Sequence, residues 1–207
     1  MNMTKTLNID NTGDSERSQL RRKLRARRQQ LSTAEQELAA SRLFKQLEKH
    51  PFFTRPDRLA FYLPADGEIS PLPLIQKAMS LGKECYLPVI KPGPEIALVF
   101  ALYEPGKSTR FNKYNIEEPD LDLAPVIEPA KLGTVFMPLA GFDADCNRLG
   151  MGKGYYDRTF SFLLENRLQA PELVGLAHEC QRVENLAAES WDVPLDAVFT
   201  GSAVYQS

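Results

Sequence analysis

Short apolar runs alternate with helical stretches along most of this 207-residue chain. Apolar residues that recur at every third or fourth position predict helices over residues 73–81 and 155–168. Six apolar runs around them have the length of buried strands, at residues 59–63, 85–90, 96–103, 134–139, 173–177 and 197–200. Strands that alternate with helices predict an α/β fold, with a mostly parallel or mixed central sheet flanked by helices on both faces.

The pattern ahead of this sheet predicts an N-terminal helical hairpin. Residues 15–30 have helical spacing and carry seven Arg and Lys residues between Arg17 and Arg28. The thin apolar stripe of this helix consists of Leu20, Leu24 and Leu31. Ser32 and Glu35 have the spacing of a capping box, which predicts that a second helix begins here and continues to residue 49.

Composition narrows the class of protein. The formal net charge of −2 lacks the basic excess of a general nucleic-acid or membrane-surface protein. Three cysteines without a Cys-x-x-Cys pair support neither a disulfide framework nor a zinc site, and no segment approaches the roughly 20 apolar residues of a membrane span. We expect a disordered head over residues 1–13 and a single α/β domain over residues 14–207, in a cytoplasmic, monomeric protein that binds small molecules rather than nucleic acid or membranes.

A glycine-rich loop over residues 148–157 is the strongest chemical signal, with the sequence Arg-Leu-Gly-Met-Gly-Lys-Gly-Tyr-Tyr-Asp. Alternate glycines let the backbone approach a ligand closely, so that successive N–H groups can converge on phosphate oxygens. Arg148 and Lys153 add positive charge, and Asp157 follows where a carboxylate could hold a divalent cation. On the glycines alone, a glycine-rich surface turn remains the alternative interpretation.

Two common nucleotide-binding signatures do not match this loop. A Walker A loop has four residues between its glycines and Ser or Thr after its lysine, whereas Gly154 follows Lys153. The dinucleotide fingerprint needs the spacing Gly-x-Gly-x-x-Gly directly after a strand. A catalytic triad is also unsupported, because His50 and His178 stand singly and there is no Gly-x-Ser-x-Gly motif.

Several charged residues outside the loop have two interpretations each. Glu68 follows the first predicted strand and could accept hydrogen bonds from a polar ring, or be a solvent-exposed acid of an Asp-Gly turn. Asp196, before the last predicted strand, could be a metal ligand or a turn residue. Arg17 and Arg21, four residues apart on one helix face, could bind an anion or lie on a solvated face.

These residues indicate an α/β protein that binds a nucleotide or phosphorylated ligand, with Mg²⁺, at the glycine loop. Gly141-Phe142-Asp143 followed by residues 147–158 also resembles the signature of the 5-formyltetrahydrofolate cyclo-ligases, or methenyltetrahydrofolate synthetases. Further similar segments lie at residues 17–21, 61–69, 114–119 and 191–200. The resemblance therefore covers nearly the whole chain after residue 14.

The resemblance implies a ligase that uses ATP and Mg²⁺ to convert 5-formyltetrahydrofolate into 5,10-methenyltetrahydrofolate, with release of ADP and phosphate. ATP would phosphorylate the formyl oxygen, and N10 of the folate would then displace phosphate. Such catalysis depends on positioning and charge neutralisation rather than on a protein nucleophile, in agreement with the missing triad.

The resemblance also implies roles for individual residues. ATP would be bound by Arg17, where the family usually has lysine, and by Arg21, Arg148, Leu149, Gly150, Met151, Gly152, Lys153, Gly154, Tyr155 and Tyr156. Of these, Arg148 and Lys153 would be catalytic. The folate would be bound by Leu63, Glu68, Met151, Tyr155 and Tyr156, and magnesium by Asp157 and Asp196.

Two other functions remain open on the sequence. A non-catalytic folate- or nucleotide-binding regulator with this fold would bind ligand without turnover. An RNA-binding accessory protein could use the basic helix that contains Arg17 and Arg28, although this helix has no aromatic residues for base stacking.

Overall fold

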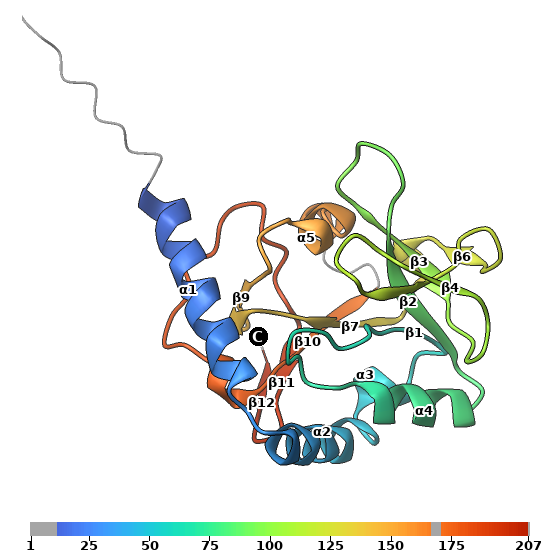
Figure 1. The fold of residues 1–207 in the computed structure, drawn as a ribbon, viewed down its shortest axis with the longest axis horizontal. Coiled ribbons are helices and arrows are strands. Elements are labelled where there is room, and N and C mark those ends of the chain that lie inside the picture. Colours follow the sequence, from blue (N-terminus) through green and yellow to red (C-terminus); the bar gives the residue numbers. More distant parts are fainter. Residues whose placement is uncertain (1–11, 167–170, 207) are drawn as a thin grey trace, which may run out of the picture.

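A computed structural model describes residues 12–166 and 171–206 and is shown in Figure 1. The helices are α1 (Thr12–Gln29), α2 (Thr33–Leu47), α3 (Pro51–Thr54), α4 (Leu72–Ser80), α5 (Tyr155–Thr159) and α6 (Phe162–Glu165), with the 3₁₀ helices η1 (Pro129–Lys131) and η2 (Glu179–Gln181). The strands are β1 (Arg58–Ala60), β2 (Glu84–Ile90), β3 (Leu98–Leu102), β4 (Thr109–Phe111), β5 (Glu117–Pro119), β6 (Val126–Ile127), β7 (Thr134–Pro138), β8 (Gly141–Phe142), β9 (Arg148–Leu149), β10 (Glu172–Leu176), β11 (Ala197–Phe199) and β12 (Val204–Gln206).

Within the described residues, eight strands form one mixed sheet in the order β12-β11-β10-β7-β1-β2-β3-β6. The five strands β11, β10, β7, β1 and β2 run parallel to one another. The flanking strands β12, β3 and β6 run antiparallel. The predicted mostly parallel or mixed sheet is confirmed, and the carboxyl ends of β1, β2 and β7 consequently meet at one edge.

Side chains alternate between two hydrophobic cores, one on each face of the sheet. Phe61 and Phe136 stack at 5.0 Å between ring centroids on the face that α2 and α4 cover. Val135 and Met137, the neighbours of Phe136 along β7, belong instead to the core under α5 and α6, which includes Phe160. Helices therefore flank both faces, as the sequence predicted (Figure 1).

The two predicted N-terminal helices are present and pack on different parts of the molecule. Helix α1 begins at Thr12 and lies against η2, whereas α2 packs against α4. Most of the predicted head, residues 1–11, lies outside the described residues. None of the helices in the described part of the chain has the length and apolar character that a membrane crossing requires.

The predicted capping box at the start of α2 is confirmed. The Ser32 hydroxyl accepts from the Glu35 N–H at 3.3 Å, and Glu35 Oε2 accepts from the Ser32 N–H at 2.8 Å. We expect Ser32→Ala to lower the free energy of unfolding by about 1 kcal/mol, because it removes the acceptor of an N-terminal N–H group. Urea titration measures this loss, and Ser41→Ala on the exposed face of α2 serves as the control. Equal midpoints for the two variants would contradict the prediction.

The predicted helix over residues 155–168 was wrong in its extent. It divides into α5 and α6, and residues 167–170 lie outside the described part of the chain. The Thr159 hydroxyl donates to the Tyr155 carbonyl at 2.8 Å and accepts from the Leu98 N–H at 2.8 Å. This contact with β3, together with the buried ring of Phe160, ends the first helix because tertiary packing outweighs helical spacing here.

Candidate functional site

A cavity of about 690 Å³ opens at the carboxyl ends of β1, β2 and β7. The end of β2 contributes Leu87, Pro88 and Ile90, and the end of β7 contributes Pro138. The hairpin of β4 and β5 closes another side with Asn112, Tyr114, Ile116, Glu117 and Glu118. The site thus lies where ligands of parallel α/β sheets generally bind.

The structure brings the predicted folate-binding residues together around this cavity. Its lining includes Leu63, Glu68, Met151, Tyr155 and Tyr156. Lys153 and Gly154 of the glycine loop line the same space, and Lys153 is exposed. Residues nearly 90 positions apart in the sequence, such as Leu63 and Met151, therefore share one cavity.

The glycine loop has the backbone conformation that its glycines predict. Gly152 has φ 97° and Gly154 has φ 68°, values that side chains other than glycine adopt at a cost. Arg21 of α1 donates from Nε to the Gly150 carbonyl at 2.9 Å. A Cβ atom on Gly152 would lie 3.5 Å from Arg21 Cζ, so the guanidinium lies against the loop backbone. The structure therefore joins Arg21 of α1 to the glycine loop.

Arg148, which is buried, forms an ion pair with the partly buried Asp157. The Arg148 guanidinium is almost fully buried and donates to Asp157 Oδ1 and to the Val193 carbonyl. The Val193 N–H also donates to Asp157 Oδ1, at 3.2 Å. Asp157 Oδ2 accepts no hydrogen bond from the residues that the structure describes. Arg148 therefore supports the loop from within the protein, by linking Asp157 of α5 to the Val193 carbonyl.

Arg17 and Asp196 lie away from the cavity lining. Arg17 donates to the Ala187 carbonyl at 2.9 Å and to Asp192 Oδ2 at 3.1 Å. Asp196 precedes β11, at the amino end of a parallel strand, and its Oδ2 accepts from the Leu173 N–H at 2.6 Å. Within residues 12–166 and 171–206, no group of three or more His, Cys, Asp or Glu side chains could hold a metal ion.

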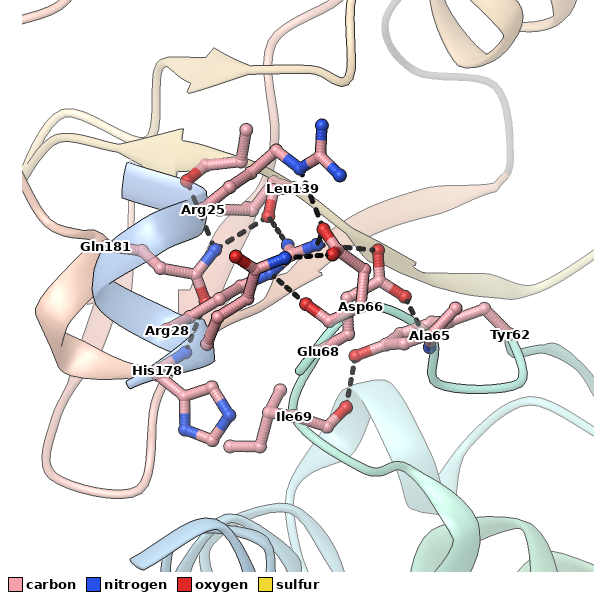
Figure 2. Close-up of polar contacts among 12 residues, drawn as sticks. Arg25, Arg28, Tyr62, Ala65, Asp66, Glu68, Ile69, Leu139, His178 and Gln181 are labelled. Atoms are coloured by element: carbon pink, nitrogen blue, oxygen red, sulfur yellow. Dashed lines mark hydrogen bonds and ion pairs between the residues drawn. The ribbon is translucent and has the colours of Figure 1, made fainter. Parts of the chain in front are cut away.

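Glu68 belongs to the turn after β1 (Figure 2) and lines the cavity. Asp66 and Gly67 have φ 52° and 74°, and the Glu68 N–H donates to the Ala65 carbonyl at 2.9 Å. Two central residues with positive φ are typical of a tight Asp-Gly turn. Glu68 Oε2 accepts from the Ala65 N–H at 3.1 Å, which fixes the side chain relative to the turn.

Three side chains of α1 hold this turn. Asp66 Oδ2 accepts from Arg25 Nε at 2.7 Å and from Arg28 Nη2 at 2.8 Å, and Gln29 donates to Asp66 Oδ1. Arg28 is fully buried, which the sequence analysis above did not predict. A signal was present, because Arg28 lies four residues after Leu24 and three before Leu31 and so continues the apolar stripe.

The two acids of the turn differ in ionisation. Burial raises the pKa of Glu68 to about 7, against the opposing attraction of the Arg28 guanidinium. Burial also raises the pKa of Asp66, but hydrogen bonds from Arg25, Gln29 and Arg28 outweigh it and leave that pKa below its usual value. Of the two acids, Glu68 is the one whose charge can change near neutral pH. Because strongly shifted pKa values are common at functional sites, this shift favours a role of Glu68 in ligand binding.

The tip of the β4–β5 hairpin lies over the glycine loop. Lys113 Nζ lies 5.4 Å from the ring centroid of Tyr114 and 6.0 Å from that of Tyr155. At the base of the hairpin, Glu118 Oε1 accepts from the Ile90 N–H at 3.1 Å and from Asn112 Nδ2 at 2.7 Å. These contacts join the hairpin to the end of β2. The sequence analysis did not assign the hairpin to the site.

A buried acid opposite a glycine loop, in one cavity at the edge of a mixed α/β sheet, defines a small-molecule-binding α/β protein. Comparison with known proteins identifies which kind. The model of the 5-formyltetrahydrofolate cyclo-ligase family matches residues 14–201, and the chain belongs to this family of enzymes.

Individual relatives agree with this assignment. The chain is 37% identical to the 5-formyltetrahydrofolate cyclo-ligase of Escherichia coli K12 over 183 residues, which cover 88% of this chain and 99% of that one. It is 38% identical to the Haemophilus influenzae enzyme over 185 residues, which cover 89% and 97% of the two chains. The solved structure of Aquifex aeolicus 5,10-methenyltetrahydrofolate synthetase has a TM-score of 0.77 at 28% identity and covers 92% of each chain.

Proposed function

We propose that this enzyme uses ATP and Mg²⁺ to cyclise 5-formyltetrahydrofolate to 5,10-methenyltetrahydrofolate, with release of ADP and phosphate. The observation that carries the proposal is the single cavity that Glu68 and the glycine loop share. A reaction between a folate and a nucleotide requires that both ligands meet, and this cavity has an acceptor for one and cationic and backbone donors for the other. Membership of the cyclo-ligase family supports the same reaction.

Glu68 would bind the pterin ring of the folate. The ring presents N–H and amino donors side by side, and a carboxylate has two oxygens that can accept them. Leu63, Met151 and Tyr156 would contact the apolar faces of the substrate, since they line the same cavity. The ring would thereby be held in one orientation, with its N5 formyl group toward the loop.

The glycine loop would bind the phosphates of ATP. Lys153 is exposed at the cavity, and Arg21 lies against the loop backbone. Bound Mg²⁺ would neutralise phosphate charge, and Mg²⁺ typically binds one or two carboxylates together with substrate phosphates. Asp157 suits this role better than Asp196 by its place in the fold, because Asp157 follows the glycine loop in the first turn of α5, whereas Asp196 lies at the amino end of β11.

The reaction would proceed in two displacements. The formyl oxygen attacks the γ-phosphorus of ATP and ADP leaves, which converts a poor leaving group into phosphate. N10 then attacks the formyl carbon, loses its proton, and phosphate leaves as the methenyl bridge forms. The residues of the chain position the reactants and neutralise negative charge, the main sources of catalysis in phosphoryl transfer.

The absorbance of methenyltetrahydrofolate tests the proposal. We expect the signal to appear when protein, ATP, Mg²⁺ and 5-formyltetrahydrofolate are mixed, and to vanish when ATP is omitted or EDTA is added. Calorimetry of folate and ATP binding runs in parallel. Binding of both ligands without any ATP-dependent signal would reject the catalytic proposal in favour of a regulator.

A further inference from the structure

Arg28 is a charged residue in the interior of the protein. Its side chain is 0% exposed, although a guanidinium cannot lose its proton in a protein. Buried charges persist where they are paired and hydrogen-bonded. The contacts of Arg28 therefore indicate what this charge does.

One guanidinium joins α1 to the ends of two parallel strands (Figure 2). After β1, Arg28 Nε donates to the Asp66 carbonyl at 2.8 Å and Nη2 donates to Asp66 Oδ2 at 2.8 Å. After β7, Nη1 donates to the Leu139 carbonyl at 3.1 Å. Gln181 of η2 donates to the same Leu139 carbonyl at 2.7 Å, so a fourth element supports the junction.

The geometry of these contacts requires arginine. Three acceptors in different directions match the planar fork of guanidinium N–H groups, whereas a lysine ammonium is a single point of charge. Arg25 cannot replace it, since Arg25 contacts the turn through its Nε hydrogen bond to Asp66 Oδ2 and lies half-exposed at the cavity.

Glu68 is the residue that this arrangement serves. Arg28 Nη2 lies 3.6 Å from Glu68 Oε1, longer than its 2.8 Å bond to Asp66 Oδ2. The arginine thus holds the turn by direct hydrogen bonds to Asp66. It attracts the Glu68 carboxylate only over the longer distance, so the carboxylate oxygens are left for other donors. Glu68 remains 11% exposed at the cavity and can still accept donors from a ligand.

We propose that Arg28 is a positioning residue, which fixes the turn of residues 66–68 between β1 and β7 so that the Glu68 carboxylate faces the folate ring in one orientation. This proposal depends on the proposed function in one respect only, the identity of the ligand as a folate. The position of the carboxylate and its electrostatic environment can be tested without any ligand.

The ionisation of Glu68 reports on this environment. The charged and titratable groups that face it are Arg25 and Arg28 of α1, Asp66 of the turn, Tyr62 after β1 and Tyr156 of α5. Of the two arginines, Arg28 has the larger influence on the Glu68 carboxyl. Burial and the negative charge of Asp66 raise the pKa of Glu68, and Arg28 lowers it. Removal of Arg28 would therefore raise the pKa of Glu68 above its value of about 7.

The experiment compares Arg28→Met and Arg28→Lys with the control Arg27→Met. Arg27 is the exposed neighbour of Arg28 on α1, so the control removes the same charge without touching the turn. Carbon-13 NMR follows the Glu68 carboxyl from pH 5 to pH 9, with Glu68→Gln as the assignment control. Steady-state kinetics then give KM for 5-formyltetrahydrofolate and for ATP separately.

For Arg28→Met we expect a higher titration midpoint of Glu68 and a folate KM raised roughly 10- to 100-fold, as misplacement of a binding group predicts, with the ATP KM unchanged. Arg28→Lys should restore most of the midpoint, because it keeps the charge, and little of the KM, because it cannot bridge the acceptors. Arg27→Met should match the wild type. A merely structural residue would lower stability without moving either readout.

Two results would overturn the proposal. One is a folded Arg28→Met protein with the wild-type midpoint and folate KM. If Arg28→Met does not fold, an Arg28→Lys protein with the wild-type folate KM has the same consequence. If the wild type shows no turnover, the proposed function fails, and the Glu68 midpoint in the variants still decides whether Arg28 controls this carboxylate.

Discussion

Lys153→Ala should lower kcat/KM for ATP by roughly 100-fold, the loss expected when one group that stabilises transition-state charge is removed. Lys153 is exposed at the cavity, so its ammonium is free to approach phosphate. Steady-state kinetics with varied ATP measure the effect. Affinity for 5-formyltetrahydrofolate in the absence of ATP should stay at the wild-type value, because Glu68 and its turn are untouched.

Two controls separate this loss from a general effect of charge. Lys45→Ala removes the same charge from an exposed position of α2 outside the cavity lining and should leave the kinetics unchanged. Lys153→Arg keeps the charge and should recover part of the activity. Unchanged ATP kinetics in Lys153→Ala would refute a phosphate-binding role for this lysine and leave Arg21 and the backbone N–H groups as the remaining candidates.

The sequence predicted the parallel centre of the sheet because those strands are continuous apolar runs buried on both faces. It did not predict β12 or the β4–β5 hairpin. Both are short, and their exposed residues lack the apolar pattern of a core strand: β5 reads Glu-Glu-Pro, and Val204 of β12 is 41% exposed. Such strands are specified by pairing with a neighbour, which spacing along the chain does not report.

The candidate site was predictable to a similar degree. The glycine loop could be found because its residue types report chemistry directly. Residue type left Glu68 with two interpretations, and only the family resemblance assigned it to the site; the structure brings both to one cavity. The pairing of Arg148 with Asp157 could not, since both residues also suit a phosphate and metal site. Spacing placed Arg17 and Arg21 on one face, yet only Arg21 contacts the loop, because the loop around Asp192 attracts Arg17.

The burial of Arg28 connects the two halves of the site. A helix whose apolar stripe includes an arginine must satisfy that charge, and the carbonyls at the ends of β1 and β7 do so together with Asp66. The same helix holds the glycine loop through Arg21, seven residues and about two turns earlier. Helix α1 is therefore the element that fixes the Glu68 turn and the glycine loop relative to each other.

Glu68→Gln should raise the folate KM by roughly 100-fold, since it replaces a charged acceptor of two hydrogen bonds by an amide with one oxygen. In the wild type, folate affinity should increase as pH rises through about 7, where Glu68 becomes charged. The variant should lose this pH dependence. Fluorescence or calorimetric titration from pH 5.5 to pH 8.5 measures both effects, and an identical pH profile in the two proteins would exclude Glu68 as the pterin acceptor.

The same substitution should change the pH dependence of stability in a defined direction. The pKa of Glu68 is about 7 in the folded protein, against its ordinary value of 4.5, so the folded state binds the proton more tightly than the unfolded state between these two pH values. The stabilisation by this proton is fully present below pH 4.5 and is lost as pH rises through 7. Relative to Glu68→Gln, the wild type should therefore lose about 3 kcal/mol of unfolding free energy from pH 4.5 to pH 8.

Urea titrations of both proteins across this pH range measure the difference directly. Glu104→Gln, at an exposed position outside the cavity lining, controls for the loss of one acid and should track the wild type. A constant difference between wild type and Glu68→Gln would mean that the pKa of Glu68 is the same in the folded and unfolded states. In that case Arg28 offsets the burial of the carboxylate completely, and folate affinity would show no rise near pH 7.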